Sequence, residues 1–101
     1  FLFILSLGGI GVISVLSNIM PKFVHNMVYD YLSGNHTLAK DSQIKSIPLI
    51  DCLFSEVNPI PVKYALQLMN YDVGEPRLPL ISMSLAGKEK LKQEMQKQKI
   101  I

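Results

Sequence analysis

The chain has 101 residues, which is enough for one domain with a modest core and too few for two ordinary domains. Hydrophobic residues make up 49% of the chain and charged residues 18%, and this balance excludes an intrinsically disordered protein. The net charge of +2 favours no polyanionic partner, so we expect no nucleic-acid binding.

Cys52 is the single cysteine, so no disulfide can form within the chain. This usage fits a reducing compartment, and we expect a cytoplasmic protein. Cys52 is expected to be a small buried hydrophobe, because a nucleophile needs a nearby base and neither His25 nor His36 is close in sequence. The chain begins at Phe1 without a methionine, so we expect a piece of a longer protein or a processed product.

Residues 1–20 contain no charge, and a run of that length is a candidate transmembrane helix. Against this interpretation stand clustered glycines, several polar residues and the lack of a basic N-terminal flank. We therefore expect no membrane span, and a small membrane protein is the less favoured alternative.

The first elements lie on either side of a glycine cluster. Residues 1–7 are apolar and fit either a strand or a short helix that ends at Gly8. After the glycines, residues 12–16 read Val-Ile-Ser-Val-Leu without polar alternation, which predicts a strand buried on both faces in a parallel sheet. The glycines precede this strand and lack the Gly-x-Gly-x-x-Gly spacing, so they predict a tight turn and not a phosphate site.

Two amphipathic helices follow. Apolar residues recur at helical spacing across residues 18–33, with Pro21 suited to the first turn and Gly34 to the stop. A second helix is expected from about residue 35 to residue 54, and Pro48 within it should kink or split it.

The last part of the chain is punctuated by proline. Residues 58–63 read Asn-Pro-Ile-Pro-Val-Lys, which predicts an extended approach to a helix ending near Asn70. Residues 75–79 should be irregular, and a final helix is expected over residues 84–99. Its five lysines and two glutamates are typical of a solvated face and not of a nucleic-acid patch.

Two blocks in this order carry a resemblance to a known family. The run Gly-Gly-Ile-Gly-Val-Ile-Ser-Val at residues 8–15 and the block at residues 58–63 are similar to the C-terminal part of dihydrodipicolinate synthase. Pro48 and the Arg-Leu-Pro at residues 77–79 fall where that family has the same residues, and the likeness spans essentially the whole chain.

The resemblance implies an α/β fold: a (β/α)₈ TIM barrel followed by a helical C-terminal domain. This chain would be its C-terminal fragment, with the last strand at 12–16 and the last barrel helix. Residues 1–34 would form the end of the barrel, and residues 35–101 the C-terminal helical domain. Residues 1–7 would then be the tail of the preceding barrel helix.

The resemblance also implies a pyruvate-dependent Schiff-base lyase, which condenses pyruvate with aspartate semialdehyde in lysine and diaminopimelate biosynthesis. Such enzymes use a lysine imine without cofactor or metal and form homotetramers. The family's catalytic lysine and tyrosines would lie upstream of Phe1, so we expect no catalytic residue here and no activity from this chain alone. Lys63 is interpreted as a solvated or capping residue.

One functional position carries over by the resemblance. Ile13 matches the family residue whose backbone carbonyl lines the pyruvate site near the lysine. Without the resemblance, the plain interpretation of Ile13 is a core residue of a buried strand. With it, we expect a packed side chain and a carbonyl that faces the site. The main alternative function is a non-catalytic, stand-alone helical fragment.

Overall fold

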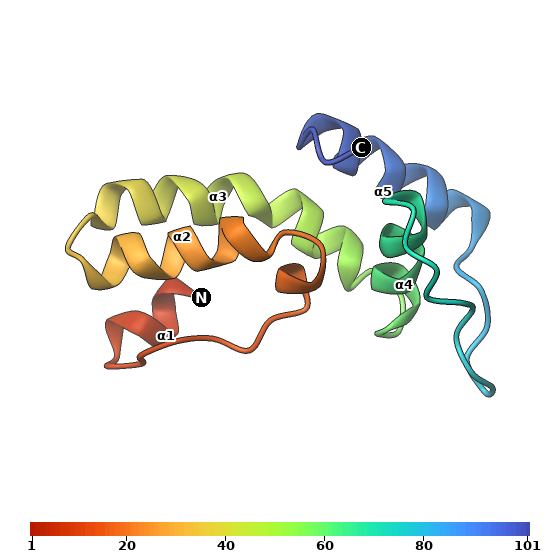
Figure 1. The fold of residues 1–101 in the computed structure, drawn as a ribbon, viewed down its shortest axis with the longest axis horizontal. Coiled ribbons are helices and arrows are strands. Elements are labelled where there is room, and N and C mark those ends of the chain that lie inside the picture. Colours follow the sequence, from red (N-terminus) through yellow and green to blue (C-terminus); the bar gives the residue numbers. More distant parts are fainter. The chain divides into compact units, whose positions relative to one another are not determined.

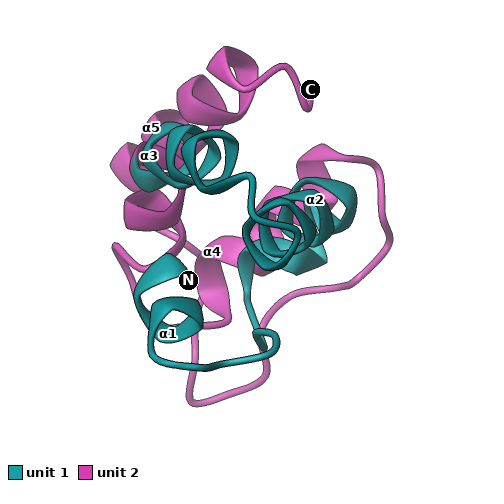
Figure 2. Cartoon of the chain, turned by 90° about the vertical axis from the view of Figure 1, so that its left-hand side faces the viewer, with its two compact units in different colours: residues 1–47 teal, residues 48–101 magenta.

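The computed structural model describes residues 1–101 and contains five α-helices, one 3₁₀-helix and no strand. The elements are α1 (Leu2–Ser6), η1 (Leu16–Asn18), α2 (Pro21–Leu32), α3 (His36–Leu53), α4 (Ile60–Leu68) and α5 (Leu85–Lys97) (Figure 1). The chain divides into two compact units, residues 1–47 and residues 48–101 (Figure 2). The boundary predicted at residue 34 lies in the turn between α2 and α3, and the predicted domain roles remain predictions.

The predicted α/β fold class, with a closing barrel strand at residues 12–16, is wrong. Residues 9–14 have no regular structure, Val15 lies in a bend, and Leu16 begins η1. A strand needs a neighbour to pair with its backbone groups, and this chain offers none. The β-branched run therefore crosses from α1 to η1 as an unpaired segment. The helices predicted around it are present.

No helix here is both long enough and apolar enough to cross a membrane. The uncharged first twenty residues contain only the short helix α1 and the single turn η1. The glycines interrupt this stretch before a spanning helix could form.

Glycine ends α1 in a Schellman motif. Gly8 has φ +99°, and its amide donates to the Leu5 carbonyl while the Gly9 amide donates to the Ile4 carbonyl. A Cβ on Gly9 would lie 2.9 Å from the Ile4 oxygen, so no side chain fits there. The helix predicted for residues 1–7 as one alternative is thus present, and Gly8 is its C-terminal stop.

The same cap recurs at the ends of three other helices. Gly34 (φ +94°) follows α2, Asn70 (φ 69°) follows α4, and Lys99 (φ 58°) follows α5. In each case the next residue's amide bonds back five positions, as from Asn35 to the Asp30 carbonyl at 2.8 Å. Four helices therefore stop at a residue in the left-handed region.

Unit 1 is built on the turn between α2 and the first part of α3, which run antiparallel from residue 34 (Figure 1). The Tyr31 and His36 rings stack across this turn, with centroids 4.3 Å apart. α1 and η1 both contact α2. The core of the unit comprises Leu5, Leu16, Ile19, Val24, Met27 and Ala39.

Pro48 does not split α3, which continues to Leu53. A proline inside a helix leaves the carbonyl four residues earlier without its amide partner. Pro48 and Ile44 are both exposed, so water can reach that carbonyl. The boundary between the two units falls at Pro48.

Unit 2 pairs α4 with α5. Pro61 occupies the first turn of α4 as predicted, although the approach through Asn58 and Pro59 is a turn with a cis peptide bond and not an extended segment. Ser84 caps α5 by accepting a hydrogen bond from the Gly87 amide at 3.1 Å. The buried core of the unit comprises Leu49, Cys52, Leu53, Ile60, Pro61, Val62, Ala65, Met83, Leu91 and Met95.

The irregular segment between α4 and α5 is fastened to α4 by side chains. Lys63 Nζ donates to the Glu75 carbonyl at 3.2 Å, and Gln67 Nε2 donates to the Gly74 carbonyl at 2.8 Å. Further along, Ser82 donates to the Glu75 carboxylate at 2.8 Å. The residues predicted to be irregular are indeed irregular, and Lys63 binds them instead of capping a helix.

Candidate functional site

The one site residue predicted from the sequence, Ile13, lies in the unpaired segment between α1 and η1. The residue is 106% exposed, as open as in a free extended peptide. The prediction of a packed core side chain is therefore wrong for this chain. The exposure of the Ile13 side chain does not test the predicted role of its carbonyl, because that role depends on the position of the backbone.

The backbone of residues 10–13 has no hydrogen-bond partner within the chain. Both flanks of this segment, by contrast, are held. On one side Gly9 is bonded to Ile4 in the cap of α1. On the other, the Ser17 amide donates to Ser14 Oγ at 3.1 Å, and the Ser17 hydroxyl donates to the Ser14 carbonyl. Four consecutive amides and carbonyls, including the Ile13 carbonyl, are thus presented between two fixed points.

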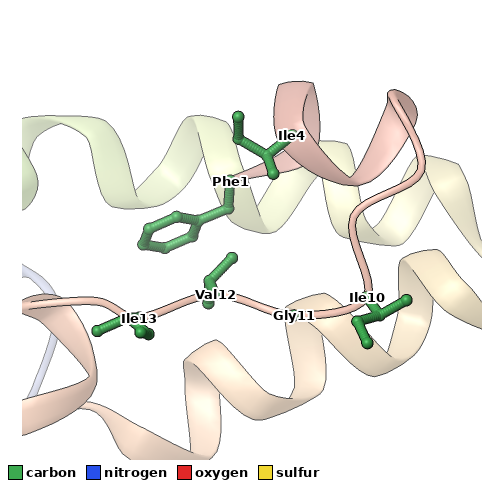
Figure 3. Close-up of a pocket in the computed structure, with 6 residues that line it drawn as sticks. All are labelled: Phe1, Ile4, Ile10, Gly11, Val12 and Ile13. Carbon is green, nitrogen blue, oxygen red and sulfur yellow. The ribbon is translucent and has the colours of Figure 1, made fainter.

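An open apolar hollow of about 530 Å³ lies beside this segment. Figure 3 shows its lining, in which Val12 of the segment points toward Phe1 at the start of α1. The lining residues are Phe1, Ile4, Ile10, Gly11, Val12 and Ile13. None of these side chains is charged or polar, so they can bury apolar surface but supply no acid, base or nucleophile.

No lysine borders the hollow. Lys63 belongs to unit 2, where its amine is engaged by the Glu75 carbonyl. Lys88 Nζ lies 5.1 Å from the centre of the Tyr64 ring in the same unit. No group of three or more His, Cys, Asp or Glu residues is arranged to hold a metal ion.

Cys52 is buried, with 2% of its surface exposed, as the sequence predicts. Burial raises the pKa of its thiol, and Glu94 and Asp51 act in the same direction against Lys90 and Lys97. A thiol nucleophile needs the thiolate form, so this environment is the opposite of an activating one. Cys52 is a core residue.

Sequence reasoning missed a polar cluster at the start of α5. The Glu56 carboxylate accepts from the Ser84 hydroxyl at 2.7 Å and from the Ser84 amide at 3.2 Å. A Cβ at Gly87 would collide with this carboxylate. The partners are 28 residues apart in sequence, and only the serine before the helix could have indicated a cap.

Comparison with known proteins identifies the family. The family model described as the dihydrodipicolinate synthetase family matches residues 1–98. The chain belongs to this family. It is 51% identical over 92 residues to the 4-hydroxy-tetrahydrodipicolinate synthase of Caldicellulosiruptor saccharolyticus, covering 91% of this chain and 31% of the relative. The synthase of Clostridium tetani is 51% identical over 98 residues, covering 97% and 33%. The predicted family is therefore confirmed.

Solved structures give the same result. The dihydrodipicolinate synthase of Thermotoga maritima superposes with a TM-score of 0.95 at 40% identity, covering 98% of this chain and 34% of that one. An Acinetobacter baumannii synthase, described as complexed with pyruvate, gives a TM-score of 0.88 at 36% identity over 94% and 33%. The chain thus spans about a third of the length of the relatives that it matches.

Proposed function

We propose that this chain forms part of a pyruvate-dependent lyase that condenses pyruvate with aspartate semialdehyde in lysine and diaminopimelate biosynthesis. The observation that carries the proposal is membership of the dihydrodipicolinate synthetase family across residues 1–98. The 51% identity to relatives named 4-hydroxy-tetrahydrodipicolinate synthase supports the same reaction. The complete lyase in this proposal is a soluble homotetramer in the cytoplasm.

In this proposal the carbonyl of Ile13 faces the pyruvate site. A carbonyl oxygen can only accept hydrogen bonds, so its partner must be a proton-bearing group such as a lysine amine or its protonated imine. The support from the chain is that this backbone is unpaired while both of its flanks are hydrogen-bonded. An acceptor held in this way needs little reorganisation when a charged nitrogen approaches.

The imine-forming lysine comes from polypeptide outside the 101 residues. A lysine becomes a good nucleophile when an apolar pocket or a neighbouring cation favours its neutral amine. The hollow beside Ile13 is apolar but has no lysine of its own. This chain by itself is therefore proposed to be inactive.

Trapping of the imine with borohydride in the presence of pyruvate tests the proposal. We expect no pyruvate adduct on this chain alone. When it is co-expressed with the Clostridium tetani synthase lacking the 98 matched residues, we expect an adduct on a lysine of that partner. An adduct on Lys63 in the isolated chain would refute the assignment of the lysine. A well-formed complex that traps no pyruvate would refute the lyase function.

A further inference from the structure

Ser14 and Ser17, which follow Ile13 directly, are joined by two hydrogen bonds. The Ser17 amide donates to Ser14 Oγ at 3.1 Å, and the Ser17 hydroxyl donates to the Ser14 carbonyl. Both residues are half-buried, so water competes for these bonds less than it does at an exposed site. Each serine therefore holds the other through its backbone and its side chain together.

Ser17 is itself held by the core of unit 1. It lies in the middle of η1, where the Asn18 amide donates to the Val15 carbonyl at 3.0 Å. The residue before it, Leu16, is buried with 2% of its surface exposed, and η1 contacts α2. A close-packed interior leaves such a turn little room to shift. Ser17 is therefore a fixed point from which the two hydrogen bonds extend back to Ser14.

The covalent geometry of Ser14 carries this restraint to the Ile13 carbonyl. The two hydrogen bonds hold two branches of the Ser14 Cα, the side chain and the carbonyl, so bond angles fix the direction of its Cα–N bond. The Ser14 nitrogen and the Ile13 carbonyl belong to the same planar peptide group. On this side of the segment, rotation about the Ser14 N–Cα bond is then the main freedom left to that carbonyl.

We propose that Ser17 is a positioning residue of the lyase, which acts through Ser14 to orient the Ile13 carbonyl toward the lysine nitrogen. This inference rests on the proposed function and deepens it, because it names the side chain that sets the direction of the acceptor. When the neutral lysine amine attacks the pyruvate ketone, its nitrogen gains a bond to carbon and a positive charge, and the ketone oxygen takes the electron pair of the C=O π bond. An acceptor already oriented toward that nitrogen stabilises the new charge without reorganisation. Because the charge develops in the transition state, loss of the Ser17 hydroxyl should lower kcat more than it weakens pyruvate binding.

The test uses a chimera, the Clostridium tetani synthase in which the 98 matched residues are replaced by those of this chain. We expect Ser17→Ala to lower kcat by about tenfold or more, while KM for pyruvate changes by less than about twofold. Ser17→Thr keeps the hydroxyl and should retain kcat within about twofold. The matched control is Ser55→Ala in unit 2, because the Ser55 hydroxyl also donates to a carbonyl three residues earlier, that of Cys52 at 2.8 Å. It should leave kcat unchanged, and circular dichroism of every variant checks that the helices are intact.

A second measurement follows the carbonyl directly in the 101-residue chain. The ¹³C chemical shift of the Ile13 carbonyl should change in Ser17→Ala and stay the same in Ser55→Ala, a difference that a loss of stability alone does not predict. An unchanged shift would overturn the proposal. So would an active chimera in which Ser17→Ala keeps the full kcat, or in which Ser17→Thr loses as much as Ser17→Ala. A chimera with the fold and oligomeric state of its parent that traps no pyruvate with borohydride would instead refute the lyase function, and with it any role of Ser17 in catalysis.

Discussion

Replacement of Ser84 tests how the start of α5 is held. The Ser84 hydroxyl does two things at once, because it accepts from the Gly87 amide at 3.1 Å and donates to the Glu56 carboxylate at 2.7 Å. Loss of an N-terminal cap costs about 0.5–2 kcal/mol in the free energy of unfolding. The bond to the carboxylate is exposed and adds less than a buried one, so we expect Ser84→Ala to cost about 1–2 kcal/mol.

Ser84→Asp separates the two roles. Aspartate is normally as good a cap as serine, so the cap alone predicts no loss. Here the new carboxylate would lie against that of Glu56, which has no proton to donate. We therefore expect Ser84→Asp to be less stable than the wild type at neutral pH.

Thermal unfolding followed by circular dichroism at 222 nm is the assay. A loss of 1 kcal/mol lowers the midpoint by about 4–8 °C for a domain of 60–100 residues. Ser82→Ala is the control, since Ser82 also donates to an exposed carboxylate at 2.8 Å but caps no helix. A Ser84→Ala midpoint equal to that of Ser82→Ala would refute the reasoning, as would a Ser84→Asp variant as stable as the wild type at neutral pH.

Three further outcomes are expected. Gly34→Ala should lower the free energy of unfolding by about 1–2 kcal/mol, because φ is +94° at this position. An added Cβ would meet no other atom, so the loss would come from the backbone conformation alone. An unchanged midpoint of thermal unfolding would contradict this. Lys99→Gly should raise stability by about 0.5 kcal/mol by relieving a left-handed φ of 58°, with Lys97→Gly as a helical control that loses stability. Cys52 should react slowly with a thiol reagent until denaturant exposes it, and because its folded pKa is raised, stability should fall as the pH rises above its ordinary value of 9.0. Rapid labelling of the native chain would contradict its burial.

The helices could be predicted because their signals are local. Pro21 at the start of α2 and Gly34 after its end carry the information within a single turn of the chain. The same holds for Pro61 in the first turn of α4. The left-handed cap at Lys99 was not predicted, because that position of a helix cap is usually glycine and the sequence has a lysine there.

The strand at residues 12–16 could not be judged locally. A β-branched run shows that a segment would suit a sheet, but whether it becomes a strand depends on partners that lie elsewhere. This chain has none, so the segment stays unpaired. The link between Glu56 and Ser84 escaped prediction for a similar reason, since the two residues meet only after the loop between α4 and α5 has returned to the end of α3.

The glycine cluster sets where the unpaired segment of the site leaves α1, which the sequence alone does not show. Gly8 and Gly9 end α1, and the close approach of Gly9 to the Ile4 carbonyl fixes where the segment leaves the helix. Ser14 and Ser17 fix where it arrives. Between these anchors the backbone keeps its hydrogen-bonding groups unused, which is costly unless solvent or a partner satisfies them. The hydrogen bonds at Gly9 and Ser17 therefore position the Ile13 carbonyl that is proposed to face pyruvate. Its proposed role also requires a lysine amine from polypeptide outside the 101 residues.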